Sequence, residues 1–178
     1  LDVVVVNAGG PPTGRFDEFD DQAWLDAVNL NLMSTVRMIR TALPYLRQSK
    51  IAAVLTITSI SVKQPFPNLV LSNSVRLAVI GLTKSLALEL GSEGIRFNSI
   101  LPTFTETDRV VSMLQDRAKR NNSTYDEEVK KQVAASPLGR MGTPQEFGNA
   151  AVFISSPAAS YLTGVMLPFD GVMYKGTL

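Results

Sequence analysis

The sequence predicts an α/β fold in which helices cover both faces of a parallel, doubly wound sheet. Two observations support this prediction. Short runs rich in β-branched residues alternate with longer stretches of helical periodicity, and small or hydroxyl residues follow each apolar run. The chain has 178 residues, of which 45% are hydrophobic, which suits a single domain with one core. Ligands of such sheets bind where the strands end.

The first half of the chain is predicted to contain two strands and a long helix. Residues 2–6 include "VVVV", which is typical of a strand buried on both faces, and a Gly/Pro loop follows. A helix in two pieces is expected over residues 20–46, because apolar residues recur there at three- and four-residue spacing. Its expected cap is Asp20 or Asp21. A second buried strand is predicted over residues 52–58.

The alternation continues with a long apolar helix. We expect it over residues 72–90, ending at Gly91 as a left-handed cap. Three polar residues at its start are candidates for the N-terminal cap: Ser72, Asn73 and Ser74.

The last part of the chain is predicted to add two strands and several helices. The strands are expected over residues 94–102 and 164–171, and one or two polar helices over residues 110–135. A final helix over residues 144–155 has Thr143 as its expected cap and a proline in its first turn.

Composition excludes several classes of function. The 17 basic and 16 acidic residues are interspersed and the net charge is +1, so no nucleic-acid partner is expected. The chain has no cysteine and no histidine, which removes disulfides, thiolate catalysis and the usual zinc sites, and we expect no metal. No apolar run reaches the roughly 18 to 20 residues of a membrane span, and the first residues, "LDVVVV", lack the basic region that is typical of a signal peptide. A cytoplasmic protein without membrane partners is expected.

The start of the chain is unusual. Leu1 replaces the usual methionine, and the chain opens within a buried-strand pattern. We expect the sequence to be the C-terminal part of a longer polypeptide, or to have lost an N-terminal segment. Its first strand would then be an open, apolar edge.

Several ordered motifs resemble those of short-chain dehydrogenases/reductases of the classical type, which include the 3-oxoacyl-carrier-protein reductases. The similar segments, in chain order, are "VVVVNAGG", "NLNLMSTVRMIRTALPYL", "TSIS", "LPTFTET" and "PLGRMGTPQEFGNAAVFISSPAASYLTGVMLPFDG". The resemblance covers residues 1–178 as the C-terminal two thirds of one Rossmann-like domain. The family's Gly-rich loop is absent from this chain, and it would be supplied by βαβ units preceding Leu1.

The resemblance assigns four catalytic positions. Asn31, favoured over Asn29 by the family spacing, would hold a structural water, and Ser59 would bind the substrate oxygen. The family's Tyr-x-x-x-Lys pair falls on Ser72 and Arg76, and the separation of Ser59 from Ser72 matches the family pattern. Both diagnostic residues are therefore replaced.

The replacement of Tyr by Ser matters because the two hydroxyl groups differ in acid strength. In the family, a Tyr hydroxyl with a reference pKa of about 10 moves the proton, and a neighbouring Lys lowers that pKa. A Ser hydroxyl is a much weaker acid, and no histidine is present to act as its base. Arg76 could hold a ribose hydroxyl but stays protonated, so it cannot relay protons. We expect weak activity on ordinary alcohols and ketones.

The resemblance also implies a nicotinamide cofactor, either NAD or NADP. Thr105 by its backbone and Thr107 by its hydroxyl would hold the carboxamide, whereas Thr103 replaces a family Gly and adds bulk there. The expected cofactor-binding residues are Asn7, Ala8, Gly9, Arg76, Pro102, Thr103, Thr105 and Thr107.

For several of these features, a role in structure alone remains an open alternative to a role in function. Residues 7–9 can form a plain turn, Ser59 can be an ordinary strand-end hydroxyl, and Arg76 can be a solvated charge. Residues 109–135 are expected to be a substrate lid, with an ordinary amphipathic helical pair as the alternative.

Two functions follow from these expectations. The first is an oxidoreductase that transfers a hydride between NAD(P) and a small carbonyl or alcohol substrate. The alternative is a catalytically inactive relative or truncated chain that acts as a binding or assembly module. The resemblance also implies a homodimer or homotetramer formed through the long helices. The apolar face of residues 77–90 is expected to be part of that interface, with core packing as the alternative.

Overall fold

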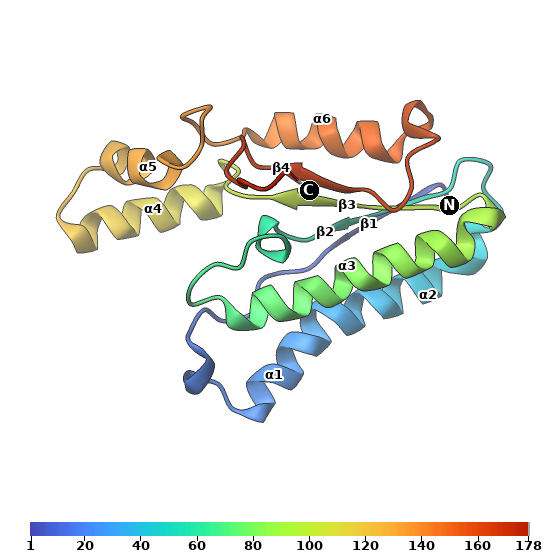
Figure 1. Ribbon diagram of the computed structural model, residues 1–178, viewed down its shortest axis with the longest axis horizontal. Coiled ribbons are helices and arrows are strands. Elements are labelled where there is room, and N and C mark those ends of the chain that lie inside the picture. Colours follow the sequence, from blue (N-terminus) through green and yellow to red (C-terminus); the bar gives the residue numbers. More distant parts are fainter. Residues whose placement is uncertain (178) are drawn as a thin grey trace.

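A parallel sheet forms the centre of the protein, as the sequence predicted (Figure 1). The computed structural model describes residues 1–177, apart from the side chain of Arg109. Within this range the sheet has four strands in the order β1-β2-β3-β4, and every neighbouring pair is parallel. The strands are β1 (Val3–Asn7), β2 (Ala53–Ile57), β3 (Arg96–Pro102) and β4 (Met166–Phe169).

The register brings the ends of the strands to one edge of the sheet. Asn7 at the end of β1 pairs with Ile57 of β2, which pairs with Ile100 of β3. Pro102 at the end of β3 pairs with Phe169 of β4. The loops that follow the strands therefore start close together, which is where ligands of parallel sheets bind.

Helices cover both faces of the sheet, so the doubly wound arrangement is confirmed (Figure 1). On one face lie α1 (Asp21–Ala27), α2 (Ser34–Leu46) and α3 (Val70–Leu90), and α6 (Pro144–Ser155) lies on the other. Val4 and Val6 pack with Ile39 and Leu46 on the first side. Leu55, Ile100 and Ile154 pack on the second.

Two further helices form a hairpin beyond the ends of the strands (Figure 1). They are α4 (Asp108–Asn121) and α5 (Tyr125–Val133). The turn between them is possible because Asn122 adopts the left-handed conformation, with φ 50°. The sequence predicted one or two polar helices after β3, and the structure has two in this segment, α4 and α5.

The predicted N-terminal caps of two helices are present. The carboxylate of Asp20 accepts a hydrogen bond from the backbone N–H of Ala23 at 2.9 Å and begins α1. Thr143 caps α6, and Glu146 bonds back to its backbone N–H in a reciprocal capping box.

Two expectations about α3 are wrong. The helix begins at Val70, one turn earlier than any of the three proposed capping residues would allow, and no side chain caps it. Asn73 instead donates from Nδ2 to the carbonyl oxygen of Phe66 at 2.9 Å. Gly91 is right-handed, with φ −60°, because a 3-10 turn continues the helix, and Gly94 takes the left-handed position with φ 78°.

β1 forms an edge of the sheet, as expected from the sequence. Its alternate valines Val4 and Val6 are buried, whereas Val3 and Val5 are 38% and 48% exposed. Val3 and Val5 line an apolar groove with Val152 of α6. None of the helices in residues 1–177 is long and apolar enough to cross a membrane.

Candidate active site

An open cleft of about 460 Å³ lies where the strands end. Its walls come from the loop after β1, the ends of β2 and β3, the start of α4, and α6. Seven of the eight expected cofactor-binding residues line it: Asn7, Ala8, Arg76, Pro102, Thr103, Thr105 and Thr107. The eighth, Gly9, is bonded to Arg76 by its carbonyl oxygen. The structure thus brings the whole expected set together.

Arg76 links three segments around this cleft. Its Nη1 donates to the carbonyl oxygen of Thr58 at 3.1 Å, and its Nη2 donates to that of Gly9 at 3.2 Å. Its Nε donates to the Oγ of Ser72 at 3.2 Å, one turn away on the same face of α3. A single guanidinium therefore ties α3 to the ends of β1 and β2, which does not fit the reading as a solvated charge.

Asn31 lies in a π-helical turn between α1 and α2, Val28–Met33, and is 2% exposed. Its Nδ2 donates to the carbonyl oxygen of Gly9 at 2.8 Å, the same oxygen that accepts from Arg76. Its Oδ1 accepts no hydrogen bond from the described residues. Asn31 lines a cavity of about 10 Å³, which is close to the space that one water needs. π turns are frequent at functional sites, and nothing in the sequence predicted this one.

The two serines have structural partners. The Oγ of Ser59 accepts a hydrogen bond from the backbone N–H of Ser61 at 3.1 Å and caps the 3-10 turn Ile60–Val62. The Oγ of Ser72 accepts from Arg76. Neither serine is among the described residues that line the cleft. The fold therefore brings neither Ser59 nor Ser72 into the described lining of the cleft.

The segment after β3 forms another wall of the cleft. The backbone N–H of Thr103 donates to the carbonyl oxygen of Phe169 at 3.1 Å, and Thr105 forms a parallel bridge with Gly142. Thr107 precedes α4, and its side chain makes no capping bond. Because the wall is held by backbone bonds, its hydroxyl side chains are positioned along the cleft.

Comparison with known proteins agrees with this arrangement. The sequence profile described as enoyl-(acyl carrier protein) reductase matches residues 1–173. The chain belongs to the short-chain dehydrogenase/reductase family.

Among curated members of this family, a tropinone reductase homolog from Arabidopsis thaliana is 34% identical over 97% of the chain and 51% of the relative. A 3-oxoacyl-acyl-carrier-protein reductase from Vibrio harveyi is 30% identical over 98% of the chain and 67% of the relative. The chain therefore spans between about half and two thirds of the length of these relatives.

Solved structures of this family superpose closely. The L-sorbose reductase from Gluconobacter frateurii, complexed with NADPH and L-sorbose, has a TM-score of 0.93 at 28% identity, over 98% of this chain and 67% of that chain. A short chain oxidoreductase from Pseudomonas aeruginosa, described as containing an atypical catalytic center and bound to NADPH, has a TM-score of 0.88 at 28% identity. The alignment with it covers 99% of this chain and 66% of that one.

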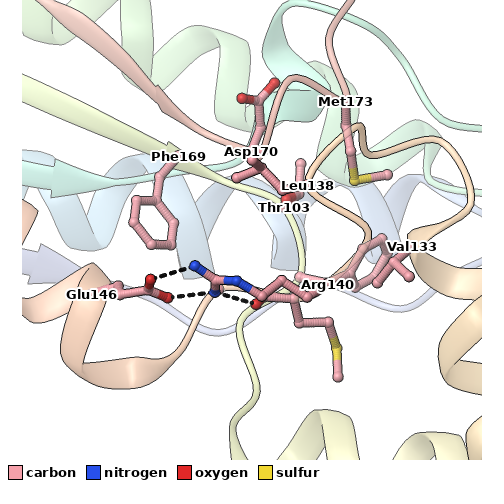
Figure 2. A pocket seen from close by; sticks show the side chains of 12 residues that line it. Thr103, Val133, Leu138, Arg140, Glu146, Phe169, Asp170 and Met173 are labelled. Carbon is pink, nitrogen blue, oxygen red and sulfur yellow. Dashed lines mark hydrogen bonds and ion pairs between the residues drawn. The ribbon is translucent and has the colours of Figure 1, made fainter.

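This short-chain dehydrogenase/reductase also has an ion pair beside the cleft that sequence reasoning missed (Figure 2). The two Nη atoms of Arg140 donate to the two carboxylate oxygens of Glu146 at 2.8 and 2.6 Å. These bonds, together with the backbone N–H of Thr143, lower the pKa of Glu146 from 4.5 to about 2. The Thr143–Glu146 capping box was the available signal for Glu146, but nothing indicated Arg140.

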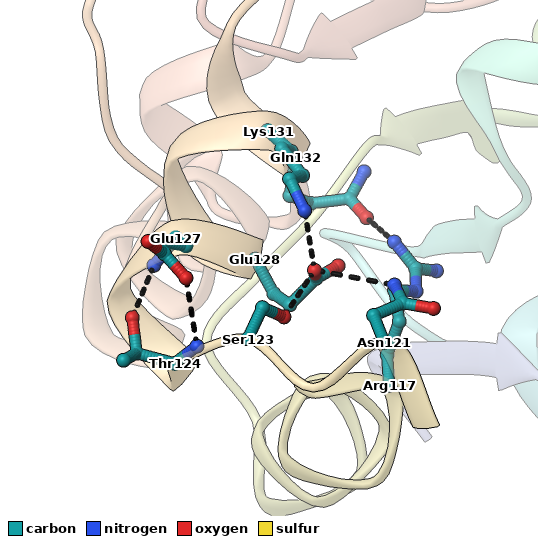
Figure 3. Close-up of polar contacts among 8 residues, drawn as sticks. All are labelled: Arg117, Asn121, Ser123, Thr124, Glu127, Glu128, Lys131 and Gln132. Atoms are coloured by element: carbon teal, nitrogen blue, oxygen red, sulfur yellow. Dashed lines mark hydrogen bonds and ion pairs between the residues drawn. The ribbon is translucent and has the colours of Figure 1, made fainter. Parts of the chain in front are cut away.

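The hairpin of this family member carries a second unpredicted cluster (Figure 3). Glu128 is 1% exposed, and its Oε1 accepts from Lys131 at 2.7 Å, Ser123 at 2.7 Å and Asn121 at 3.2 Å. These bonds, that of Lys131 foremost, lower the pKa of Glu128 to about 2. The cluster joins the two helices of the hairpin through one carboxylate. Among the described residues, no group of three or more acidic side chains could hold a metal ion.

Proposed function

We propose that the protein is an oxidoreductase that transfers a hydride between NAD or NADP and a carbonyl or alcohol substrate. One observation carries this proposal: the cleft at the ends of the strands is lined by the residues that the family pattern assigns to the cofactor. Small and hydroxyl side chains there let a flat ring approach the backbone closely. The relatives named above, which include NADPH complexes, support the same function.

The residues present fit the nicotinamide and ribose end of such a cofactor. A bound nicotinamide would supply or accept the hydride. Arg76 would donate to a ribose hydroxyl, and the backbone of Thr105 with the hydroxyl of Thr107 would hold the carboxamide. Residues 1–177 contain no Gly-rich phosphate loop, so they supply the reacting end of the site and not its phosphate cradle.

The catalytic roles are also part of the proposal. Asn31 would hold a water in the small cavity that it lines together with Thr58 and Arg76. Ser59 would bind the substrate oxygen, and Ser72 with Arg76 would stand in the positions of the Tyr and Lys. Because a Ser hydroxyl is a weak acid and Arg76 does not titrate, proton transfer would be slow in this protein.

The hairpin formed by residues 109–135 is proposed to be the substrate lid. Val110 at the start of α4 lines the cleft, so the hairpin is attached at its wall. Its internal bonds through Glu128 would let it move as one unit.

We also propose that two or four copies associate through α2 and α3. The outer faces of these helices expose apolar side chains, including Met38, which is 45% exposed, Leu77, which is 52% exposed, and Leu88, which is 77% exposed. Light scattering after size exclusion would measure the oligomeric state, and a monomer would contradict this part of the proposal.

A second function, a non-catalytic binding or assembly role, is favoured by one observation. The hydroxyl of Ser72 is engaged by Arg76, and the described lining of the cleft contains no phenol or carboxyl group. Titration of the full chain with NADH and NADPH, followed by carbonyl reduction assays, separates the two functions. Binding with turnover supports the oxidoreductase. Binding without turnover supports the inactive relative, and no binding rejects the cofactor site.

A further inference from the structure

The backbone of Gly142 holds the cleft wall on both sides of Thr105. The N–H of Glu106 donates to the carbonyl oxygen of Gly142 at 2.9 Å, and the N–H of Gly142 donates to the carbonyl oxygen of Phe104 at 3.2 Å. Thr105 therefore lies between two bonds to one residue, in the parallel bridge that it forms with Gly142. Since Thr105 lines the cleft, the place of its peptide groups depends on where Gly142 is held.

Arg140 fixes the chain on either side of Gly142 (Figure 2). Its Nη1 donates to the carbonyl oxygen of Met141 at 3.0 Å, and its two Nη atoms donate to the two carboxylate oxygens of Glu146. The Oε2 of Glu146 in turn accepts the backbone N–H of Thr143 at 2.8 Å. The residue before Gly142 and the residue after it are thus both bonded to the same ion pair.

The ring of Phe169 packs directly against the backbone of Gly142. A Cβ built at residue 142 would lie 2.6 Å from a ring carbon of Phe169, so there is no room for a side chain between them. Phe169 also meets Phe147, which lines the cleft, edge to face with ring centroids 5.3 Å apart. A shift of the Gly142 backbone would therefore push into an aromatic pair that borders the cleft.

We propose that Arg140 and Glu146 are positioning residues for the nicotinamide end of the cleft. They act through Gly142, whose bonds set the place of Thr105, and the backbone of Thr105 would hold the carboxamide. This inference rests on the proposed function and deepens it, because it assigns the orientation of the nicotinamide to an ion pair outside the described lining of the cleft. A planar guanidinium suits this role, because its fixed fork serves two carboxylate oxygens and a carbonyl oxygen at the same time.

A second forked ion pair in the chain separates the effect of position from the loss of charge pairing. Arg47 bonds to both carboxylate oxygens of Glu93, at 2.6 and 3.1 Å. The two side chains are 49% and 36% exposed, which is close to the 54% and 42% of Arg140 and Glu146. Arg47 follows α2 and Glu93 precedes β3, so this pair lies where the strands begin, at the edge of the sheet opposite to the cleft. Arg47→Gln is therefore the matched control for Arg140→Gln.

The first test measures amide hydrogen exchange in the full chain without cofactor. Arg140→Gln is expected to speed the exchange of the Gly142 and Glu106 amides by about fivefold, the equivalent of one hydrogen bond. The amide of Thr103 lies on the same wall but bonds outside the turn, so it should keep the parent rate. Arg47→Gln should change none of these amides. No change at residues 106 and 142, or an equal rise at residue 103, would overturn the positioning role.

The second test uses reduced nicotinamide mononucleotide, which carries the reacting end of the cofactor without its adenosine half. Its dissociation constant, measured by the fluorescence of the ring, should rise by about fivefold in Arg140→Gln and keep the parent value in Arg47→Gln. In turnover, Arg140→Gln should raise KM for NADPH and leave KM for the carbonyl substrate unchanged. Arg140→Lys keeps the charge but cannot form the fork, so it should lose as much binding as Arg140→Gln. Full binding in Arg140→Lys would mean that charge alone matters, which contradicts the proposal.

The outcomes separate the positioning role from the proposed function. Thr107→Val removes the hydroxyl that is proposed to hold the carboxamide, and it should also weaken binding of the mononucleotide. If Thr107→Val weakens binding and Arg140→Gln does not, the positioning role is wrong and the cofactor site stands. If exchange at residues 106 and 142 responds to Arg140→Gln but the parent chain does not bind the mononucleotide, the ion pair positions Thr105 and the proposed cofactor site is wrong.

Discussion

The Nε of Arg76 donates to the Oγ of Ser72 at 3.2 Å, and both residues lie on one face of α3. The remaining nitrogens of the same guanidinium donate to the backbone at the ends of β1 and β2. Arg76 therefore fixes the position of the Ser72 hydroxyl relative to the sheet. This hydroxyl is well placed by its neighbours, but it lacks the acidity that proton transfer requires.

Restoring a phenol and an amine at this corner should increase activity. We expect Ser72→Tyr combined with Arg76→Lys to raise the rate of carbonyl reduction by about 10² to 10⁴, the usual contribution of general acid catalysis. The rate is measured at saturating NADPH, and cofactor binding is checked by titration. An unchanged rate with cofactor bound would show that proton delivery does not limit this protein.

Asn31 is expected to stabilise the fold as well as the site. Asn31→Ala removes the bond to the Gly9 carbonyl and should lower the free energy of unfolding by about 1 to 3 kcal/mol. Urea denaturation measures this loss. Asn29→Ala is the matched control, because Asn29 lies in the same π turn but is exposed and bonds only to Arg37 among the described side chains. Equal losses in the two variants would refute the assigned role.

Arg96 closes the end of α6. Its two Nη atoms donate to the carbonyl oxygens of five residues: Ile154, Ser155, Ser156, Ala159 and Leu162. Arg96→Met leaves these oxygens without their donor and should lower the free energy of unfolding by about 2 to 4 kcal/mol. Arg47→Met removes only an exposed pair with Glu93 and should change stability much less. A loss at residue 47 as large as that at residue 96 would contradict this interpretation.

Stability should fall in acid through two carboxylates. Glu128 and Glu146 each have a pKa lowered from 4.5 to about 2 in the folded protein. Their stabilising effect is complete above about pH 4.5 and is lost as the pH falls toward 2, because the unfolded state takes up the proton first. The slope of the unfolding free energy against pH depends on how many more protons the unfolded state binds than the folded state. Glu128→Gln and Glu146→Gln should each lower that difference by about one proton in this pH window. Denaturation curves from pH 5 to 2.5 measure that slope, and an unaltered slope would be the contrary result.

Features that depend on local sequence were predicted from the residues. The strands over 52–58 and 94–102 were identified within two residues, because apolar runs and their borders are local. Thr143 was identified as a cap for the same reason, and Asp20 was one of two candidates for the other cap. The start of α3 was missed, and no local capping side chain marks it. The residue before this helix region is held by a contact distant in sequence, in which Gly14 donates to the carbonyl oxygen of Asn68 at 2.8 Å.

The candidate site likewise contains features that the sequence predicted and features that depend on contacts distant in sequence. Family spacing identified residues that the fold does gather around one cleft, including Asn7, Arg76 and Thr107. It did not predict the π turn around Asn31, whose bond to Gly9 joins residues 22 apart in sequence. The fold also brings Lys63, just after Ser59, to within 5.2 Å of the Tyr174 ring centroid, and no local pattern indicates such a contact.

The π turn at Val28–Met33 makes the length of this helical segment critical. A π turn accommodates one more residue than an α-helical turn, and each residue of an α-helix rotates the chain by about 100°. Deleting one residue between 28 and 33 would let α1 and α2 join as one regular helix. Either Asn31 would then turn away from Gly9, or the stripe of Ile39, Ala42 and Leu46 would turn away from the sheet. A substitution in this segment leaves the rotational phase between α1 and α2 unchanged, whereas a change in its residue count shifts that phase.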